Sequence, residues 1–290
     1  MLQVARLAPK QLGEARDLVA GFFRAHLNPD GGFQNRSGAS DLYYTVFGLD
    51  GLVALQEPLP VEHATRYLQA FGDGAELDFV HLACLARAWA AIGREPDPGV
   101  AARILARVDS FRSADGGYDT TPASPAGSAY GAFLALGTYQ DLRRELPDSA
   151  AVLASLQGLR AADGSYAMAP GLASGLTPIT AAAVVAARHL GAAADRDAGM
   201  WLLDRCHASG GFFVARDAPM PDLLSTGTAL HALSTLHVPI AGIREACLDF
   251  IDSLWTNRGG FYGSWGDDEP DCEYTYYALL ALGHLSLESA

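Results

Sequence analysis

A short turn motif, two small residues followed by an aromatic residue, recurs along the whole chain. Clear copies are DGGFQ from residue 30, DGGYD from 115, DGSYA from 163, SGGFF from 209 and RGGFY from 258, and a degenerate copy, FGDGAELD, begins at 71. Self-similarity at a period of this length indicates that one supersecondary unit is copied and stacked. The sequence therefore predicts six structural repeats.

Each turn is followed by a loop of variable length and then by an apolar stretch of helical length. These stretches are rich in Ala and Leu and begin near residues 41, 78, 128, 178, 225 and 272. Because they are apolar almost all round, they are typical of buried helices. More amphipathic segments such as QLGEARDLVAGFFRAHL and RDAGMWLLDRCHA lie between them. This alternation predicts an all-α fold, a single (α/α)6 toroid with six inner and six outer helices.

Closure into a ring follows from the way such repeats bury their core. A helical hairpin alone covers only one side of its inner helix, and stacked neighbours complete the burial. An open solenoid is the alternative, but its end repeats are usually polar, whereas the last repeat here contains YTYYALLALGHL. Without a linker or a shift in composition, we expect residues 1–290 to form one domain.

Composition limits the partners and the setting. The net charge is −13 and the pI about 4.9, which disfavours nucleic acid and anionic membrane surfaces because both repel an acidic protein. The sequence predicts no membrane-spanning or targeting segment. Its four cysteines are too few and too far apart to suggest a disulfide framework, so a reducing cytoplasm is the simplest setting.

The turn itself has a structural explanation. Gly31 and Gly32 allow positive φ where an outer helix ends and the chain reverses, and Phe33 is expected to fill the space beneath the turn. This interpretation leaves the polar loop that follows, NRSGASD, unexplained.

The turns, loops and helix starts together resemble the repeats of protein prenyltransferase beta subunits and of squalene and related terpene cyclases. The copies GGFQNRSGASDLYYTVFGLDGL and GGFYGSWGDDEPDCEYTYYALLALG carry the resemblance, which covers essentially the whole chain. It implies a toroid around an apolar, aromatic-lined cavity that holds an isoprenoid, with reactive groups at the starts of the inner helices.

The closer likeness, to prenyltransferase beta subunits, implies specific site residues. Arg36 in GGFQNR matches the loop arginine that contacts the isoprenoid diphosphate. Asp41 matches an aspartate ligand of zinc, Tyr44 an aromatic residue beside it, and His81 in DFVH the histidine ligand. The family's cysteine position is occupied by Tyr43, a poor zinc ligand, so Cys84, one turn beyond His81, is the candidate thiolate. The resemblance also implies a helical protein partner.

The cyclase branch implies a different chemistry, in which an acidic DxDD motif at an inner-helix start protonates an alkene. No DxDD occurs in this chain. The acidic run nearest to it contains Asp267, Asp268, Glu269, Asp271 and Glu273. Such a run suits a divalent cation, although a solvated loop is its commoner meaning.

Each of these residues also has a purely structural explanation. Asp41, Asp78 and Asp271 stand where helix caps are expected, and Arg36 is able to pair with an acidic neighbour. His81 and His231 suit buried, hydrogen-bonded histidines. The tyrosines suit core packing, but aromatic rings gathered around one cavity also suit a carbocation or a polyprenyl chain. This group comprises Tyr43, Tyr44, Tyr130, Tyr274, Tyr276 and Tyr277.

Three functions stay open at this point. The first is an isoprenoid-handling enzyme, with Asp41 and His81 as catalytic acid and base or, with Cys84, as ligands of Zn²⁺. Its substrate would contact Arg36 and the group Tyr43, Tyr44, Tyr130, Asp271, Glu273 and Tyr274. The second is a non-catalytic lipid-binding toroid, and the third a toroid that binds another protein. Six helix N-termini at one end of a ring would favour an anion such as a diphosphate, which the local carboxylates oppose.

Overall fold

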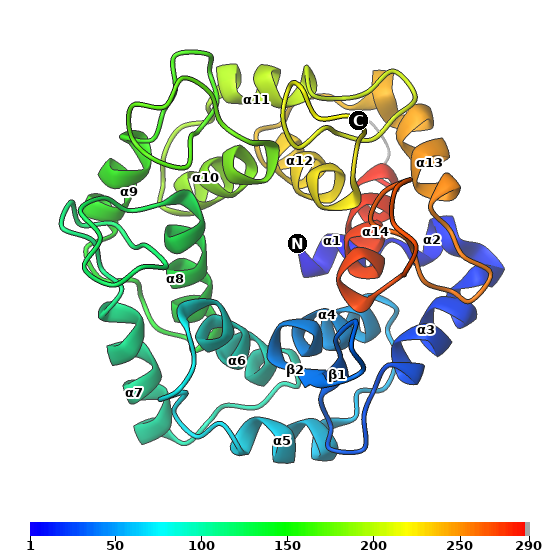
Figure 1. Cartoon of the computed structure of the whole chain (residues 1–290), viewed down its shortest axis with the longest axis horizontal. Helices are drawn as coiled ribbons and strands as arrows, with labels where there is room; N and C mark the ends of the chain where they lie inside the picture. The colour runs from blue at the N-terminus through cyan, green and yellow to red at the C-terminus, as the bar shows by residue number, and fades with distance from the viewer. Residues whose placement is uncertain (288–290) are drawn as a thin grey trace.

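The chain folds into two concentric rings of helices (Figure 1). A computed structural model describes residues 1–287. Within them, the inner ring consists of α4 (Leu42–Ala54), α6 (Phe79–Ala91), α8 (Ala129–Asp141), α10 (Thr177–His189), α12 (Leu223–Thr235) and α14 (Cys272–Leu285). The outer ring consists of α3 (Arg16–Ala25), α5 (Val61–Gln69), α7 (Pro98–Asp109), α9 (Ser149–Gln157), α11 (Arg196–Leu203) and α13 (Arg244–Ser253). The predicted all-α toroid is confirmed.

Shorter elements complete the structure. They are α1 (Leu2–Ala5), α2 (Pro9–Leu12), the 3-10 turns η1 (Gly13–Ala15) and η2 (Ala241–Ile243), and the two-residue antiparallel strands β1 (Phe33–Gln34) and β2 (Ser40–Asp41). In the part of the chain that is described, no helix combines the length and apolarity needed to cross a bilayer.

The inner ring is closed. Each inner helix packs against the next one along the chain, and α14 packs against both α12 and α4. This contact between the last and first inner helices excludes the open solenoid. It also places loops of the first and last repeats side by side, although more than two hundred residues separate them in sequence.

Most inner helices begin where the sequence predicts, because an N-cap residue defines each start. Asp41, Asp78, Ser128, Asp222 and Asp271 each accept hydrogen bonds from main-chain N–H groups of the first turn. The fifth inner helix begins at Leu223 instead of near 225, since its cap is Asp222. Thr177 begins the fourth, with Pro178 in the first turn.

The two glycines of the first turn serve different purposes. Gly31 has φ +98°, and a Cβ there would lie 2.2 Å from the His63 carbonyl oxygen. The prediction of positive φ for Gly32 is wrong, because this residue lies outside the left-handed region. A glycine is needed there for another reason: a Cβ would lie 2.7 Å from the Tyr67 ring. Phe33 is fully buried beneath the turn, as predicted.

A buried threonine links each of several turns to the inner helix that follows. The Phe33 N–H donates to Thr45 Oγ1 at 2.9 Å, and that hydroxyl donates to the Asp41 carbonyl oxygen at 2.6 Å. Thr226 and Thr275 accept from the corresponding aromatic residues at 2.9 and 3.1 Å. The threonine in the recurring Asp-x-x-x-Thr pattern therefore satisfies a buried N–H that the turn leaves without a partner.

Replacing Thr226 by Val tests this link. The variant keeps the side-chain shape but leaves the buried Phe212 N–H unpaired, so we expect the free energy of unfolding to fall by about 1–3 kcal/mol. Urea denaturation followed by circular dichroism measures this change. Thr228→Val on the same helix is the control, because Thr228 bonds only to carbonyls of its own helix. If both variants lose the same unfolding free energy, the hydrogen bond between Thr226 and the turn does not contribute to stability.

The segment before the first repeat lies at the opposite end of the ring from these turns. α1 packs against α14 and α4, and a Cβ at Gly283 near the end of α14 would lie 2.2 Å from the Val4 carbonyl oxygen. We call the end with the inner-helix N-termini the mouth, and the end covered by α1 the far end.

Candidate functional site

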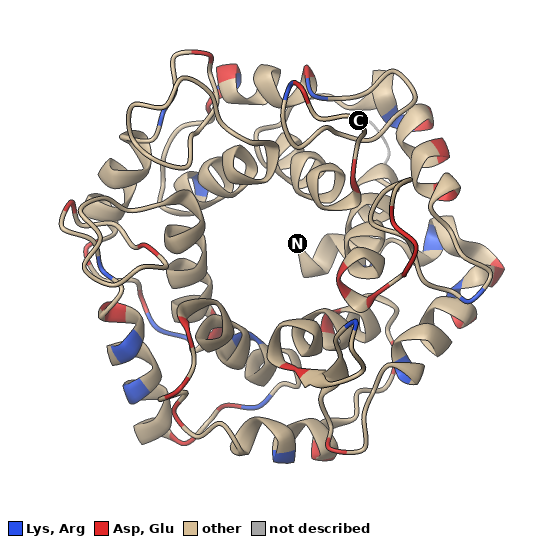
Figure 2. Cartoon of the chain, in the orientation of Figure 1, with Lys and Arg blue, Asp and Glu red and all other residues tan. Residues whose placement is uncertain are grey.

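A cavity of about 380 Å³ lies inside the inner ring. Apolar and aromatic side chains form much of its wall, among them Tyr130 near the mouth and Val46, Phe47, Phe133, Leu134 and Tyr277 in the middle. Lys, Arg, Asp and Glu residues lie mostly on the outer helices and loops (Figure 2). A volume of this size, within an apolar wall that carries a few polar groups, is typical of a small-molecule site.

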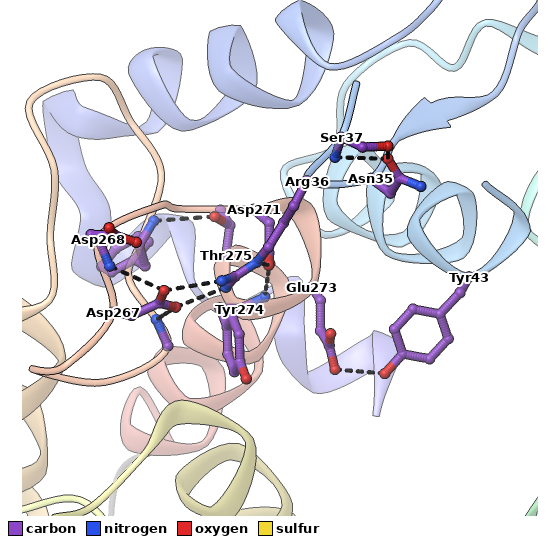
Figure 3. A network of polar contacts seen from close by, with 12 residues as sticks. Asn35, Arg36, Ser37, Tyr43, Asp267, Asp268, Asp271, Glu273, Tyr274 and Thr275 are labelled. Atoms are coloured by element: carbon purple, nitrogen blue, oxygen red, sulfur yellow. Dashed lines mark hydrogen bonds and ion pairs between the residues drawn. The ribbon is translucent and has the colours of Figure 1, made fainter. Parts of the chain in front are cut away.

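Arg36 is held by two carboxylates at the mouth. Its Nη1 and Nη2 donate to Asp267 at 3.1 and 2.8 Å, and its Nε donates to Asp271 Oδ2 at 2.9 Å (Figure 3). Burial raises the pKa of Asp271, and the Arg36 guanidinium and the Tyr274 N–H only partly oppose that rise. The arginine predicted to contact a diphosphate is thus engaged by the protein's own acidic loop.

Glu273 lies between the mouth and the cavity. Its carboxylate accepts a hydrogen bond of 2.6 Å from the Tyr43 hydroxyl, which comes from the other side of the ring closure (Figure 3). Burial raises the pKa of Glu273 to about 7, although the Tyr43 hydrogen bond lowers it. Tyr43 itself lines the cavity. A carboxyl group that keeps its proton near neutral pH therefore stands beside an aromatic-lined space.

Tyr44 and Tyr274, also predicted to contact substrate, lie at the entrance. They line a hollow of about 480 Å³ together with Arg36, Asp271 and Glu273. The Arg36 guanidinium carbon lies 5.7 Å from the centre of the Tyr274 ring, within the range of a cation–π contact. Tyr130 lies apart from this group, on the cavity wall.

The predicted pair Asp41 and His81 is brought together at the mouth. His81 Nε2 lies 3.9 Å from Asp41 Oδ2, and His81 Nδ1 lies 2.9 Å from Asp78 Oδ1. Asp41 Oδ1 accepts the Tyr43 and Tyr44 N–H groups, so it also caps α4. The expectation of a buried His81 is wrong: its side chain is 35% exposed, because it stands in the first turn of its helix.

The residues predicted to hold zinc do not form a zinc site. Within residues 1–287, no three His, Cys, Asp or Glu side chains are grouped so as to hold a metal ion. The Asp78 carboxylate engages His81 Nδ1 and leaves Nε2 toward Asp41, and burial raises the pKa of the Cys84 thiol to about 12. No third ligand joins Asp41 and His81 in the described part of the chain, so this set of residues does not fit the ion.

The sequence predictions missed charged residues deeper in the cavity. Asp50, Arg87 and Asp141 all line it, as does His231, for which the sequence leaves both a functional and a buried structural role open. A signal was present in the sequence, since Asp50 and Arg87 interrupt otherwise apolar helices in FGLDGLV and CLARAWA. Charged side chains in such places are rarely buried without a partner.

Two solved structures share the overall architecture. The Candida albicans protein geranylgeranyltransferase-I complexed with GGPP superposes with a TM-score of 0.69 at 11% identity, covering 91% of this chain and 89% of that one. A variant of the type II terpene cyclase MstE from Scytonema, in complex with geranylgeranyl dihydroxybenzoate, gives 0.64 at 15% identity, covering 96% and 97%. At such identities the likeness shows the fold alone.

A comparison with curated protein sequences returned no match. The model of the prenyltransferase alpha-alpha toroid domain matches residues 11–85, 81–192 and 178–289, which together span nearly all of the chain. The repeats, the closed double ring and this match agree, and the chain belongs to the prenyltransferase alpha-alpha toroid family.

Proposed function

We propose that this protein is an enzyme that binds an isoprenoid in the central cavity and protonates one of its double bonds, with Glu273 as the proton donor. The observation that carries the proposal is the partly buried Glu273 carboxyl, which lines the hollow at the mouth and accepts a hydrogen bond from Tyr43, a residue that lines the aromatic cavity. A general acid works best when its pKa lies near the operating pH. That both fold neighbours are solved with geranylgeranyl compounds supports an isoprenoid as the ligand.

The electrostatics of the mouth disfavour a diphosphate. Side chains already cap five of the inner helices, so one or two of the free N–H groups at each of these starts are bonded within the protein, and a carboxylate stands at four of the five. Arg36 is paired with both Asp267 and Asp271. A diphosphate would have to displace these carboxylates and then lie among them. An isoprenoid without a diphosphate meets no such cost.

The proposed chemistry balances as a proton transfer. The O–H bond of Glu273 breaks, its proton forms a C–H bond with one alkene carbon, and the π electrons supply that bond. The other carbon becomes a cation, which the faces of rings such as Phe47, Tyr130 and Tyr277 stabilise. The Tyr43 hydroxyl stabilises the carboxylate that is left. The Glu273 carboxylate, or water in the cavity, then accepts a proton from the rearranged cation, and the C–H electrons form the new double bond of an isomer of the substrate.

The remaining predicted residues have supporting roles in this proposal. Asp41 and His81 form an acid–base pair at the water-facing mouth, suited to returning a proton to the site. Arg36 and Asp271 hold the acidic loop in place over α14. Tyr44 and Tyr274 line the entrance through which the substrate passes.

Binding and turnover of paired ligands test the proposal. We expect geranylgeraniol to bind at least tenfold more tightly than geranylgeranyl diphosphate in native mass spectrometry. Gas chromatography coupled to mass spectrometry should then detect a product of unchanged mass. Tighter binding of the diphosphate would contradict the proposed electrostatics. Binding without conversion across a panel of isoprenoid alcohols, esters and hydrocarbons would show a non-catalytic binding protein.

The pH dependence of turnover should follow Glu273. Because burial raises its pKa to about 7, the proton is present below that pH and is lost above it. We expect a rate that is steady from about pH 5 to 6.5 and then falls about tenfold per pH unit above 7. Initial rates between pH 5 and 9 measure this profile. A rate that rises through pH 7 would indicate that Glu273 acts as a base.

A further inference from the structure

The far end of the cavity is polar, in contrast to its middle. Asp50, Arg87, Asp141 and His231 line it, and Tyr276 stands beside them on α14. Asp141 is the last residue of α8, and Asp50 lies nine residues into α4, so these groups are well beyond the level of Glu273, the second residue of its helix. None of them has a part in the chemistry proposed at the mouth.

Arg87 and Asp50 form an ion pair in which Arg87 keeps an unused hydrogen-bond donor. Arg87 Nε and Nη2 both donate to Asp50 Oδ2, at 2.9 and 2.5 Å. The Asp50 side chain is only 2% exposed, whereas Arg87 keeps 30% exposure and lines the cavity. Among residues 1–287, Arg87 Nη1 donates to no protein group. A donor on a fixed guanidinium is therefore available to a molecule in the cavity.

Several neighbouring polar groups lack partners in the described part of the chain. The Asp141 carboxylate faces the cavity and forms no hydrogen bond or ion pair there, and burial raises its pKa to about 6. The Tyr276 hydroxyl is completely buried close to Arg87, but it forms no hydrogen bond of normal geometry. His231 Nδ1 lies 3.1 Å from His284 Nε2, while His284 Nδ1 is buried and unpaired. Buried polar groups without partners are costly.

We propose that the far end is a binding subsite for an uncharged polar group, a hydroxyl or a carbonyl, at the inner end of the ligand. A hydroxyl suits it because it donates to Asp141 and accepts from Arg87 Nη1. The inference rests on the proposed function only in taking the cavity as the ligand site. It does not depend on proton transfer from Glu273.

The charges of the far end favour a neutral group over an ion. Asp50 and Arg87 neutralise each other, and the Met1 amino group at the same end, whose pKa burial lowers, opposes the Asp141 carboxylate, so the far end offers no net charge to an ion. Burial lowers the pKa of His231 to about 2, so its ring stays neutral. An ion would also lose its hydration on passing the apolar middle of the cavity.

Two C15 probes of similar shape, farnesol and farnesene, test the subsite. We expect wild-type protein to bind the alcohol about tenfold more tightly than the hydrocarbon, the effect of one net buried hydrogen bond. Asp141→Leu should abolish this preference, so that the two probes bind about equally. Its affinity for farnesene should stay within about threefold of the wild-type value. Asp141→Asn, which keeps a hydrogen-bonding side chain, should restore most of the preference.

A matched variant at the mouth separates the two proposals. Glu273→Gln should keep the preference for farnesol, because it changes only the other end of the cavity. If the preference survives Asp141→Leu and is lost in Glu273→Gln, the hydroxyl binds at the mouth and the far-end subsite is wrong, while the cavity remains the ligand site. Equal affinities of the wild type for both probes would also overturn the subsite. Failure of both probes to bind would overturn the cavity proposal itself.

Discussion

Glu273→Gln is expected to lower turnover of an isoprenoid by about 10²- to 10⁴-fold while leaving its affinity within a few-fold of wild type. The amide keeps the size of the side chain and accepts the Tyr43 hydrogen bond, but it has no acidic proton to transfer. Single-turnover rates and equilibrium binding, measured with the same ligand, separate the loss of chemistry from a loss of binding.

Glu269→Gln is the matched control for this variant. Glu269 belongs to the same acidic loop but is exposed to solvent, so its replacement should leave the rate unchanged. Tyr43→Phe should give an intermediate loss, since it removes the hydroxyl that stabilises the ionised carboxylate. If Glu273→Gln retains more than a tenth of the wild-type rate, another group must supply the proton.

The titration of Glu273 should also be visible in stability. Its pKa is raised from 4.5 in the unfolded chain to about 7 in the folded protein, so the folded state holds the proton over a range in which the unfolded state has lost it. The contribution of Glu273 to the free energy of unfolding is therefore fully present below about pH 4.5 and is lost as the pH rises through about 7. Glu273→Gln should remove this component from a plot of unfolding free energy against pH.

Arg87→Met is expected to destabilise the fold by about 3 kcal/mol. The Asp50 carboxylate is 2% exposed and receives both of its charged hydrogen bonds from Arg87. Methionine roughly preserves the side-chain volume but leaves this carboxylate uncompensated, and breaking a buried ion pair by removing one partner is strongly destabilising. Urea unfolding curves, compared at a single pH, measure the change.

An exposed ion pair on the outer ring provides the control. Arg103 pairs with Asp73 at 2.6 Å, but its side chain is 59% exposed, so Arg103→Met should cost less than about 1 kcal/mol. The double variant Asp50→Leu with Arg87→Met should recover most of the lost stability, because it removes both charges together. If Arg87→Met lowers the free energy of unfolding no more than Arg103→Met, water in the cavity must solvate Asp50 well enough that stability does not depend on the ion pair.

Local patterns were enough to predict the fold. The Gly-Gly-aromatic turns, the aspartate caps and the threonine four residues after the cap act over a few residues, so they are readable wherever they occur. The errors are local as well. The fifth inner helix starts two residues early because Asp222 caps it, and Gly32 is required by the nearby Tyr67 ring, which sequence spacing does not reveal.

The site was predicted only in part. Helix starts placed Asp41 and His81 on neighbouring repeats, and they do lie close together. The zinc prediction needed Cys84 to be grouped with Asp41 and His81, and no such group forms among the described residues. Burial also raises the pKa of the Cys84 thiol. A residue's protonation depends on the desolvation and the charges around it, and for a residue on an inner helix these come from other repeats.

The sequence by itself determined the repeat, the caps and turns, and an acidic protein with an apolar interior, because all of these depend on neighbours within one hairpin. Only the tertiary structure decided what the mouth and the far end contain. Ring closure joins the first repeat to the last, so that Arg36 meets Asp271 across 235 positions and Tyr43 meets Glu273 across 230. These contacts neutralise Arg36, which matches the family's diphosphate-contacting arginine, and hold the partly buried carboxyl group that we propose as the acid.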